Sequence, residues 1–348
     1  MKIKPSQKLL FGLISILLLS FSSCKVDSKV IPIVTDDDIV LKWPVYFPSP
    51  IYNFEENPRT KEGFLLGKKL FYDPILSRDN TISCGSCHQQ FVAFAQADHK
   101  VSHGINNLLG VRNSPALFNL IWQKEFFFDG GSKHIELQPI GPITNPVEMD
   151  ETIERVVYKL GQNAAYRSLF KSAFDSDSIT SQLMLKAIVQ FMGSLISANS
   201  RYDKYIQDPV NNPFNNDEKS GLALFEKKCA NCHVPPLFTD NSYRNNGLDE
   251  TFMDSGRFRI TNINSDMGKF KVPSLRNIEL TYPYMHDGRY ETLEKVLNHY
   301  SSEIKQSATL DPVLTNGIAL SITEKAQIIA FLKALTDKEF IKDVRFKE

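Results

Sequence analysis

Hydrophobic positions recur at helical spacing along much of the chain. Between Ser181 and Ile206 the apolar residues follow an i, i+3, i+4 pattern, which predicts one long helix. Its apolar positions are Leu185, Ile188, Met192, Leu195 and Ile196. The polar run Asn211-Asn212-Pro213 ends this pattern. Because the alternation typical of strands is scarce, the pattern predicts an all-α fold that is rich in loops and has few strands.

Three further segments predict helices. The segment from Thr323 to Leu335 has helical spacing and begins with Thr323 as a candidate N-cap. Gly67-Lys68-Lys69-Leu70-Phe71 and Gly221-Leu222-Ala223-Leu224-Phe225 are alike, and each comes shortly before a cysteine motif. The length of 348 residues exceeds that of one average domain. We therefore expect two domains, residues 61–208 and 209–348, packed against each other.

The cysteine motifs are two copies of Cys-x-x-Cys-His, at Cys84–His88 and Cys229–His233. In c-type haem attachment the two thiols form thioethers with the haem, and the adjacent imidazole becomes the proximal iron ligand. A zinc site would need more thiolates or imidazoles nearby, and a thioredoxin-like redox pair needs no trailing histidine. The sequence therefore predicts two covalently bound haem c groups. Their expected protein ligands are Cys84, Cys87, His88, Cys229, Cys232 and His233.

The first 60 residues read as an export signal and a spacer. Lys2, Lys4 and Lys8 precede an apolar run from Leu9 to Leu19, which is too short to span a bilayer comfortably. The small residues before Cys24 are typical of a bacterial lipoprotein signal, in which Cys24 is lipidated. A cleaved signal without a lipid, or an uncleaved anchor, are the alternatives. We expect residues 1–24 to be the signal, 25–60 to be a tether, and the protein to be membrane-anchored and periplasm-facing.

Charge and cysteine usage narrow the class further. The 40 basic and 40 acidic side chains cancel, and no basic stripe suggests nucleic acid as a partner. Of the 5 cysteines, four belong to the haem motifs and the fifth is Cys24, so none remains for a disulfide. Balanced charge gives no indication of where a partner protein docks.

Three segments outside the haem motifs carry a resemblance to a known family. They are Arg112-Asn113-Ser114-Pro115, Lys271-Val272-Pro273-Ser274-Leu275-Arg276-Asn277 and Pro283-Tyr284-Met285-His286-Asp287-Gly288. Together with the haem motifs they resemble the bacterial di-haem cytochrome c peroxidase family, from about Gly63 to Lys338. The resemblance implies two cytochrome c-like domains, with a peroxidatic haem in the first and an electron-accepting haem in the second. It also implies hydrogen peroxide as substrate, a small cytochrome c or copper protein as electron donor, and a possible homodimer.

The resemblance assigns residues to the first haem. Glu148 matches the acid–base glutamate of the family, which moves a proton between the oxygens of peroxide, and Gln138 matches its pocket glutamine. The alternative is an exposed loop glutamate and a structural glutamine. His103 matches a histidine that, in many members, occupies the distal iron position until the second haem is reduced. A solvated loop histidine, or ligation by the nearby His99, is the alternative.

At the second haem the chain departs from the peroxidases of the family. The position of their distal methionine is Tyr300, a hard anionic ligand that would lower the haem potential. The related di-haem enzyme that matures the tryptophan tryptophylquinone of methylamine dehydrogenase has a tyrosine there. The alternative is that Tyr300 packs within a helix while Met285, His299 or Met267 coordinates the iron, or none does.

Two further assignments rest on the resemblance. In the family a tryptophan lies between the two haems, and its position is Phe128 here, a residue that is much harder to oxidise. The nearby Trp122 is expected to be a core aromatic residue. Members of the family bind a calcium ion through an asparagine side chain and backbone carbonyls. The positions of these ligands match Asn113, Thr281 and Pro283.

The sequence therefore predicts a cytochrome-c peroxidase. An oxidase that modifies a partner protein by holding two oxidising equivalents across two irons is the alternative; Tyr300 favours it and Phe128 argues against it. A plain electron-transfer cytochrome is a third class, and Glu148 and Gln138 count against it because a pure carrier needs no acid–base group beside an open iron.

Overall fold

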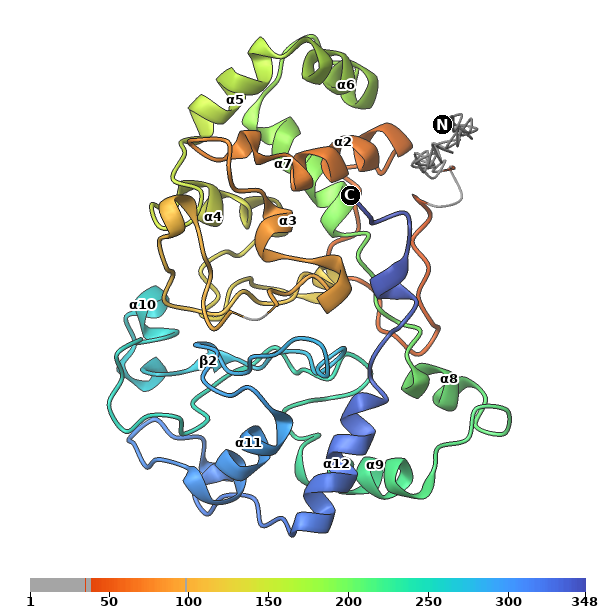
Figure 1. The fold of residues 1–348 in the computed structure, drawn as a ribbon, viewed down its shortest axis with the longest axis vertical. Coiled ribbons are helices and arrows are strands. Elements are labelled where there is room, and N and C mark those ends of the chain that lie inside the picture. The colour runs from red at the N-terminus through yellow and green to blue at the C-terminus, as the bar shows by residue number, and fades with distance from the viewer. Residues whose placement is uncertain (1–34, 36–38, 98) are drawn as a thin grey trace, which may run out of the picture. The chain divides into compact units, whose positions relative to one another are not determined.

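The computed structural model describes residues 35, 39–97 and 99–348, and these residues are mostly helical with few strands (Figure 1). The predicted signal and the lipidation site Cys24 lie outside the described residues. The helices are α2 Lys61–Tyr72, α3 Cys84–Cys87, α4 Ile140–Thr144, α5 Ile153–Gln162, α6 Ala164–Phe174, α7 Ser181–Met192, α8 Arg201–Gln207, α9 Asn216–Lys228, α10 Phe258–Thr261, α11 Leu293–Asn298 and α12 Ile322–Lys333. Strands β1 Tyr243–Arg244 and β2 Phe270–Lys271 pair antiparallel. The mostly helical class predicted from the sequence is confirmed.

The first hydrophobic cluster is organised around the packing of α2 on α7. Phe64 and Phe71 of α2 lie against Phe191 of α7, with ring centroids 5.6 and 5.1 Å apart. Gly67 allows the close crossing, because a β-carbon there would overlap the carbonyl oxygen of Ala187. This helix pair brings the chain to the first haem motif.

The second cluster repeats the same arrangement with α9 and α12. Phe225 of α9 lies 5.0 Å from Phe331 of α12, and both are fully buried. A β-carbon on Gly221 would overlap the carbonyl oxygen of Gln327. The helices predicted around Gly67 and Gly221 are therefore confirmed, and each contains a glycine at its crossing point.

The long helix predicted from Ser181 to Ile206 is wrong. The chain forms α7 and α8 instead, with an extended segment between them. The Nδ2 of Asn119 donates to the carbonyl oxygen of Ser197 at 2.9 Å, and the Ser197 N–H donates to Asn119 Oδ1 at 2.9 Å. Asp337 Oδ2 accepts the N–H groups of residues 198 and 199 at 3.1 and 2.9 Å. These partners replace helical hydrogen bonds, and they come from distant parts of the chain.

The start of α12 also differs from the prediction. Its N-cap is Ser321 rather than Thr323, and Ser321 Oγ accepts the Glu324 N–H at 3.2 Å. The Glu324 side chain reciprocates by accepting the Ser321 N–H at 2.8 Å. This capping box gives a better start than Thr323 because it satisfies two N–H groups at once.

The expected tether is packed in its described part. Residues 43–54, here called the strap, contain Phe47 and Phe54, which are only 5% and 7% exposed. Trp43 packs edge-on against Trp122 at 5.9 Å between ring centroids. The reason is the aromatic content of the strap, because such rings contribute a large buried area. The strap is thus part of the first cluster, whereas the sequence predicted a tether up to residue 60.

The C-terminus returns to the same cluster. Phe340 and Phe346 are buried among its residues, although they lie in the segment that the sequence predicts to be the second domain. The division into residues 61–208 and 209–348 stays a prediction.

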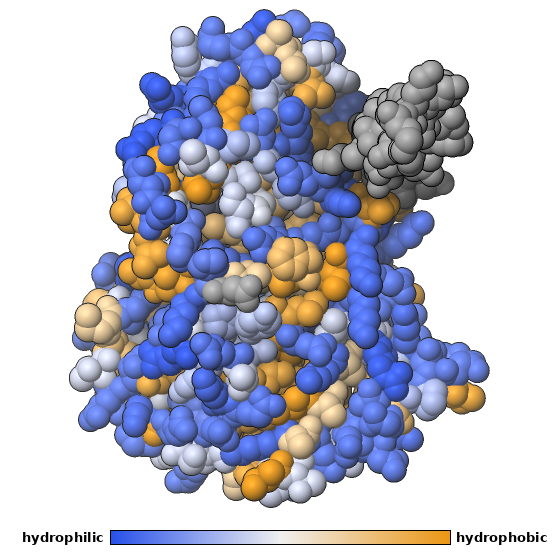
Figure 2. All heavy atoms as spheres, in the orientation of Figure 1, coloured by the Kyte–Doolittle hydropathy of each residue, from blue (hydrophilic) through white to orange (hydrophobic). Residues whose placement is uncertain are grey.

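On the face shown in Figure 2 hydrophilic side chains predominate, and apolar ones form small scattered patches. Such isolated apolar residues are normal for a folded protein. Among the described helices, none is both long and apolar enough to cross a membrane.

Candidate haem sites

The first haem motif forms the short helix α3, and His88 follows it directly. His88 Nδ1 lies 3.0 Å from the carbonyl oxygen of Phe94, and the Pro115 carbonyl also accepts from this imidazole. Burial lowers the pKa of His88 to about 4, so the ring is neutral at ordinary pH. With Nδ1 held by backbone carbonyls, Nε2 is the nitrogen left for iron, as in many metal-bound histidines.

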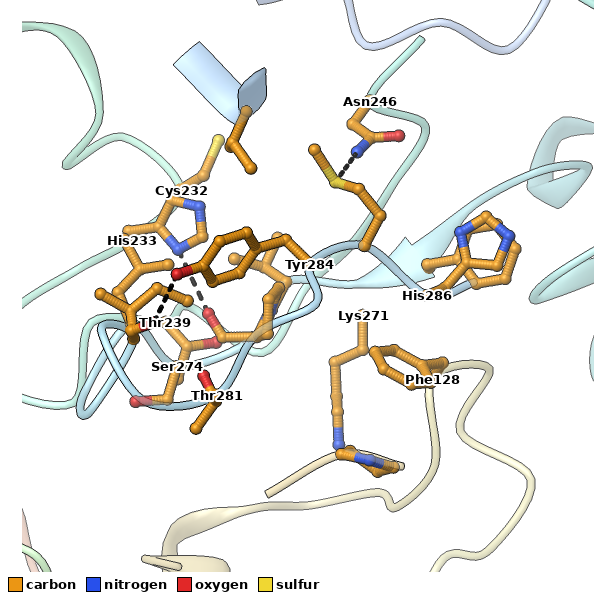
Figure 3. Close-up of a pocket in the computed structure, with 18 of the residues that line it drawn as sticks. Phe128, Cys232, His233, Thr239, Asn246, Lys271, Ser274, Thr281, Tyr284 and His286 are labelled. Atoms are coloured by element: carbon orange, nitrogen blue, oxygen red, sulfur yellow. Dashed lines mark hydrogen bonds between the residues drawn. The ribbon is translucent and has the colours of Figure 1, made fainter. Parts of the chain in front are cut away.

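The second motif repeats this geometry. His233 Nδ1 lies 3.2 Å from both the Phe238 and the Pro273 carbonyl oxygens, and Figure 3 shows His233 beside Cys232 and Ser274. Pro115 and Pro273 each belong to a motif segment that follows its haem motif in the sequence. The two carbonyl partners of each imidazole were not predicted, because any residue type carries a carbonyl group.

A cavity of about 320 Å³ extends from the second motif to residues of the first cluster. Its lining includes Cys229, Cys232 and His233, together with many apolar side chains. The thiols of both motifs are free. Free paired thiols, a neutral imidazole with one nitrogen held and a mostly apolar cavity fit covalently bound haem c.

Glu148 lies beside the first motif. Burial raises the pKa of the Cys87 thiol, and the negative charge of the Glu148 carboxylate raises it further. Cys87 Sγ lies 3.6 Å from the carbonyl oxygen of His103. Burial raises the pKa of Glu148, while hydrogen bonds from Asn145 and Ser102 oppose that rise. The structure therefore brings together Glu148, Cys87 and the His103 backbone. Ser102 and Asn145 escaped the sequence analysis, since nothing in their spacing marks them.

Gln138 is 9% exposed and lines the cavity, whereas Glu148 and His103 lie outside its lining. The ring of His103 packs edge-on against that of His99, with centroids 4.3 Å apart. Both imidazoles therefore sit together on one loop, and the alternative of His99 as ligand stays open.

Tyr300 lies in a π-helical turn, His299–Glu303, directly after α11. It lines the same cavity as Cys229 and His233, and burial raises its pKa, while a hydrogen bond with Asn246 opposes the rise. Single π-turns are frequent at functional sites. The tyrosine is thus on the wall of the cavity that the second haem would fill.

The other candidate distal ligands, His299, Met267 and Met285, differ in the groups that they contact. His299 Nε2 is engaged with the carbonyl oxygen of Asn246 at 3.0 Å, and Met267 lines a different pocket. Met285 does line the cavity, and its Sδ accepts from Asn246 Nδ2 at 3.5 Å (Figure 3). Of the four candidates, Tyr300 and Met285 line this cavity, and Asn246, which was not predicted from the sequence, contacts both.

The comparisons with known proteins decide the family. The sequence model of the di-haem cytochrome c peroxidase family matches residues 61–211. Cytochrome c551 peroxidase of Nitrosomonas europaea is 36% identical over 277 residues, which are 78% of this chain and 79% of that protein. The chain belongs to the di-haem cytochrome c peroxidase family.

Other members of this family are also similar. Methylamine utilization protein MauG of Methylorubrum extorquens is 33% identical over 298 residues, 83% of this chain and 82% of that protein. The crystal structure of a MauG-like protein associated with microbial copper homeostasis superimposes with a TM-score of 0.81 at 33% identity, covering 88% of this chain and 99% of that one. The di-haem peroxidase BthA of Burkholderia thailandensis shares the fold, with a TM-score of 0.70 at 21% identity. Family membership implies two haem c groups, which the two motifs would hold.

The remaining predicted residues of this di-haem family member lie around the cavity. Phe128 lines it (Figure 3). Its carbonyl oxygen accepts the Lys271 N–H at 2.7 Å. Trp122 instead donates from Nε1 to the Pro48 carbonyl oxygen at 2.8 Å and is 2% exposed, which confirms its core role.

The residues expected to bind calcium, Asn113, Thr281 and Pro283, all line the cavity as well. Asn113 Nδ2 donates to the Lys100 carbonyl oxygen at 3.1 Å. These three oxygen-bearing residues come from both halves of the sequence and share the lining of one cavity.

Proposed function

We propose that the protein is a cytochrome-c peroxidase that reduces hydrogen peroxide to water with electrons from a small redox protein. The observation that carries this proposal is the partly buried carboxyl group of Glu148 beside the first Cys-x-x-Cys-His motif. The names of the similar proteins, cytochrome c551 peroxidase among them, point the same way.

The chain's own residues supply the proton chemistry. The haem irons would supply the site where peroxide binds and the electrons that reduce it. Glu148 accepts the proton of one peroxide oxygen and returns it to the other, which leaves as water when the O–O bond breaks. Two electrons from the donor protein and two further protons would convert the remaining oxygen to a second water. Ser102 and Asn145 hold the carboxylate in place, and Gln138 orients the peroxide by hydrogen bonding.

His103 is proposed as a reductive gate. Its loop lies against Glu148, so an imidazole on the distal iron position would exclude peroxide until the loop moves. Reduction of the second haem by the donor protein is the proposed signal. The gate would keep the enzyme closed until electrons are available.

An oxidase that modifies a partner protein is the second candidate. The observation that favours it is Tyr300 on the wall of the cavity beside Cys229 and Cys232, because a phenolate ligand stabilises oxidised iron. Phe128, in place of an oxidisable tryptophan, argues against a hole relay between the haems. A plain electron-transfer cytochrome is the third candidate, and a proton-transfer group beside the first motif argues against it.

The setting of the enzyme completes the proposal. We infer that it faces the periplasm, is anchored by a lipid on Cys24, and binds calcium through Asn113, Thr281 and Pro283. Calcium prefers oxygen ligands of this kind. A homodimer is the expected assembly. Removal of calcium by a chelator should change the activity or the activation by reduction, and no change in either would contradict the calcium site.

The proposal is tested by adding peroxide to the haem-loaded protein with a reduced cytochrome c as donor. A peroxidase oxidises two donor molecules for each peroxide consumed. Oxidation of the protein without donor turnover, lasting for minutes, would instead support the partner-modifying oxidase. Absence of any reaction with peroxide, in the oxidised and half-reduced protein alike, would support the plain carrier.

A further inference from the structure

The carbonyl cradle around His233 is built from two loop segments, residues 234–239 and 272–276. The Phe238 and Pro273 carbonyl oxygens, one from each segment, both lie 3.2 Å from His233 Nδ1. Ser274 Oγ ties the segments together by donating to the Leu237 carbonyl oxygen at 2.6 Å. The orientation of the imidazole therefore depends on the relative position of these two segments.

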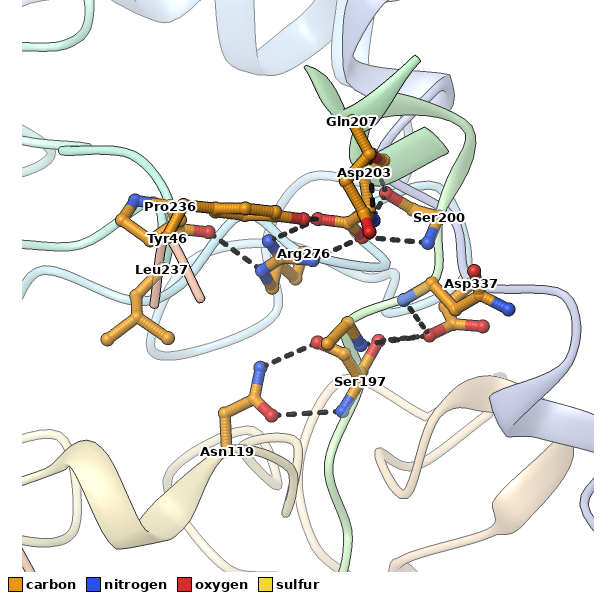
Figure 4. A network of polar contacts seen from close by, with 12 residues as sticks. Tyr46, Asn119, Ser197, Ser200, Asp203, Gln207, Pro236, Leu237, Arg276 and Asp337 are labelled. Atoms are coloured by element: carbon orange, nitrogen blue, oxygen red, sulfur yellow. Dashed lines mark hydrogen bonds and ion pairs between the residues drawn. The ribbon is translucent and has the colours of Figure 1, made fainter. Parts of the chain in front are cut away.

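A buried arginine makes a second tie between them. Arg276 Nε donates to the Pro236 carbonyl oxygen at 2.8 Å, two residues before Phe238 (Figure 4). The guanidinium also lies 4.7 Å from the ring of Phe47 and 5.7 Å from that of Phe238. Arg276 is fully buried, so these contacts fix it tightly.

The charge of Arg276 is balanced by Asp203 of α8, which is also fully buried. Both guanidinium arms, Nη1 and Nη2, donate to the carboxylate at 2.8 Å. Tyr46 of the strap donates its hydroxyl to Asp203 Oδ1 at 2.8 Å, and Ser200 donates its N–H and its hydroxyl to Oδ2 at 2.7 Å each. Burial would raise the pKa of Asp203, but the hydrogen bonds and charge of Arg276 outweigh it and lower that pKa, so the pair is ionised.

The carbonyl groups around His88 of the first haem motif have no arginine at the position that corresponds to Arg276. Three residues after Pro115 stands Phe118, whereas three residues after Pro273 stands Arg276. The next residues, Asn119 and Asn277, share a left-handed backbone with φ of 54° and 56°, which confirms that the positions correspond. Phe118 packs on the ring of Phe340, 6.2 Å away, so an apolar contact replaces the ion pair.

A buried ion pair is a poor source of stability, because the cost of removing both charges from water offsets their attraction. A positional role explains its presence beside one cradle and not the other. We propose that Arg276 is a positioning residue for His233, holding segment 234–239 so that both carbonyls fix the imidazole at the second haem. Asp203 and Tyr46 in turn hold Arg276. This inference rests on the proposed function only in requiring haem at both motifs.

The test replaces the pair by neutral groups of similar size, Asp203→Asn with Arg276→Gln. A looser cradle weakens the hydrogen bond from Nδ1, which makes the ligand less basic and ferric iron less favoured. The midpoint potential of the second haem should therefore become more positive, and its low-spin EPR signal should shift or broaden. The potential and EPR signals of the first haem should not change. Signals of the second haem are assigned as those that Tyr300→Phe alters.

Two further variants keep the test decisive. Tyr46→Phe removes one hydroxyl far from the haem and should shift the same potential in the same direction by a smaller amount, even if the double variant fails to fold. Arg201→Gln with Glu218→Gln removes a more exposed ion pair between α8 and α9, with Nε to Oε1 at 2.7 Å, and should leave the potential unchanged. A fall in melting temperature with unaltered potentials and EPR signals would overturn the proposal. So would an equal shift in the Arg201 control. These measurements use no peroxide, so their result does not depend on whether the protein is a peroxidase. The peroxide turnover assay tests that proposal independently.

Discussion

Gly104 lies so close to Glu148 that a β-carbon on Gly104 would overlap the Cα and the carbonyl oxygen of Glu148. The N–H of Ile105 also donates to that carbonyl oxygen at 2.8 Å. The preceding residue is His103. The loop that carries the proposed gate and the backbone of the proposed catalytic acid therefore form one packed unit, and neither can move far without the other.

Gly104→Ala should separate the loop from Glu148 and lower peroxide turnover by about 10²-fold, because a displacement on the order of 1 Å has that effect in active sites. Haem content should stay unchanged, which the absorption spectrum checks. The control is Gly161→Ala in α5, where an added β-carbon meets no atom within 4 Å. That variant should keep full turnover and gain up to about 1 kcal/mol of stability. Full turnover in Gly104→Ala would show that the packing is irrelevant to catalysis.

The pH dependence of turnover should report the carboxyl group of Glu148. As a base it must be deprotonated, so kcat/KM should rise with pH through a pKa that burial holds above the ordinary value. Ser102→Ala removes a hydrogen bond that lowers this pKa, and the rising limb should move to higher pH. Ser176→Ala, at a partly exposed serine in the segment after α6, serves as control. A shift to lower pH, or none, would contradict the role of Ser102.

His103→Ala should remove the requirement for prior reduction. With the distal position open, the first haem should give a high-spin EPR signal in the fully oxidised protein, and peroxide should react at once. His99→Ala is the matched variant, since its ring lies beside that of His103. If only His99→Ala opens the resting enzyme, the gate is assigned to the wrong imidazole.

Tyr300→Phe should raise the midpoint potential of the second haem, because it removes a hard anionic ligand. Met285→Leu tests the neighbouring sulfur, which also contacts Asn246, and should leave the potential almost unchanged. A redox titration followed by absorption distinguishes them. The opposite pattern would assign the distal position to Met285.

The sequence predicted the haem motifs, the helices around Gly67 and Gly221 and the mostly helical class, because each depends on residues close together in the chain. The break between α7 and α8 could not be predicted, since Asn119 and Asp337 supply its partners from about 80 and 140 residues away. The packed strap was missed for a different reason. Its prolines, with the acidic run Asp36-Asp37-Asp38 before it, suggested a spacer, whereas Phe47 and Phe54 are buried in the first cluster.

In the candidate site the side chains could be predicted from the sequence, but the groups that hydrogen-bond to them could not. The imidazoles of His88 and His233 were found by motif, whereas their carbonyl partners carry no signal of residue type. Asn246 has no neighbouring motif, yet it contacts both Tyr300 and Met285. These supports become visible only when the loops are folded together.

The central claim, proton transfer by Glu148 at a peroxidatic haem, is tested most directly by peroxide turnover of the haem-loaded, half-reduced protein and its Glu148→Gln variant. Gln keeps the size of the side chain and removes its ability to accept a proton. The account predicts that turnover falls by about 10²–10⁴-fold in the variant, with the absorption spectrum of both haems unchanged. Turnover equal to that of the unmodified protein would contradict it.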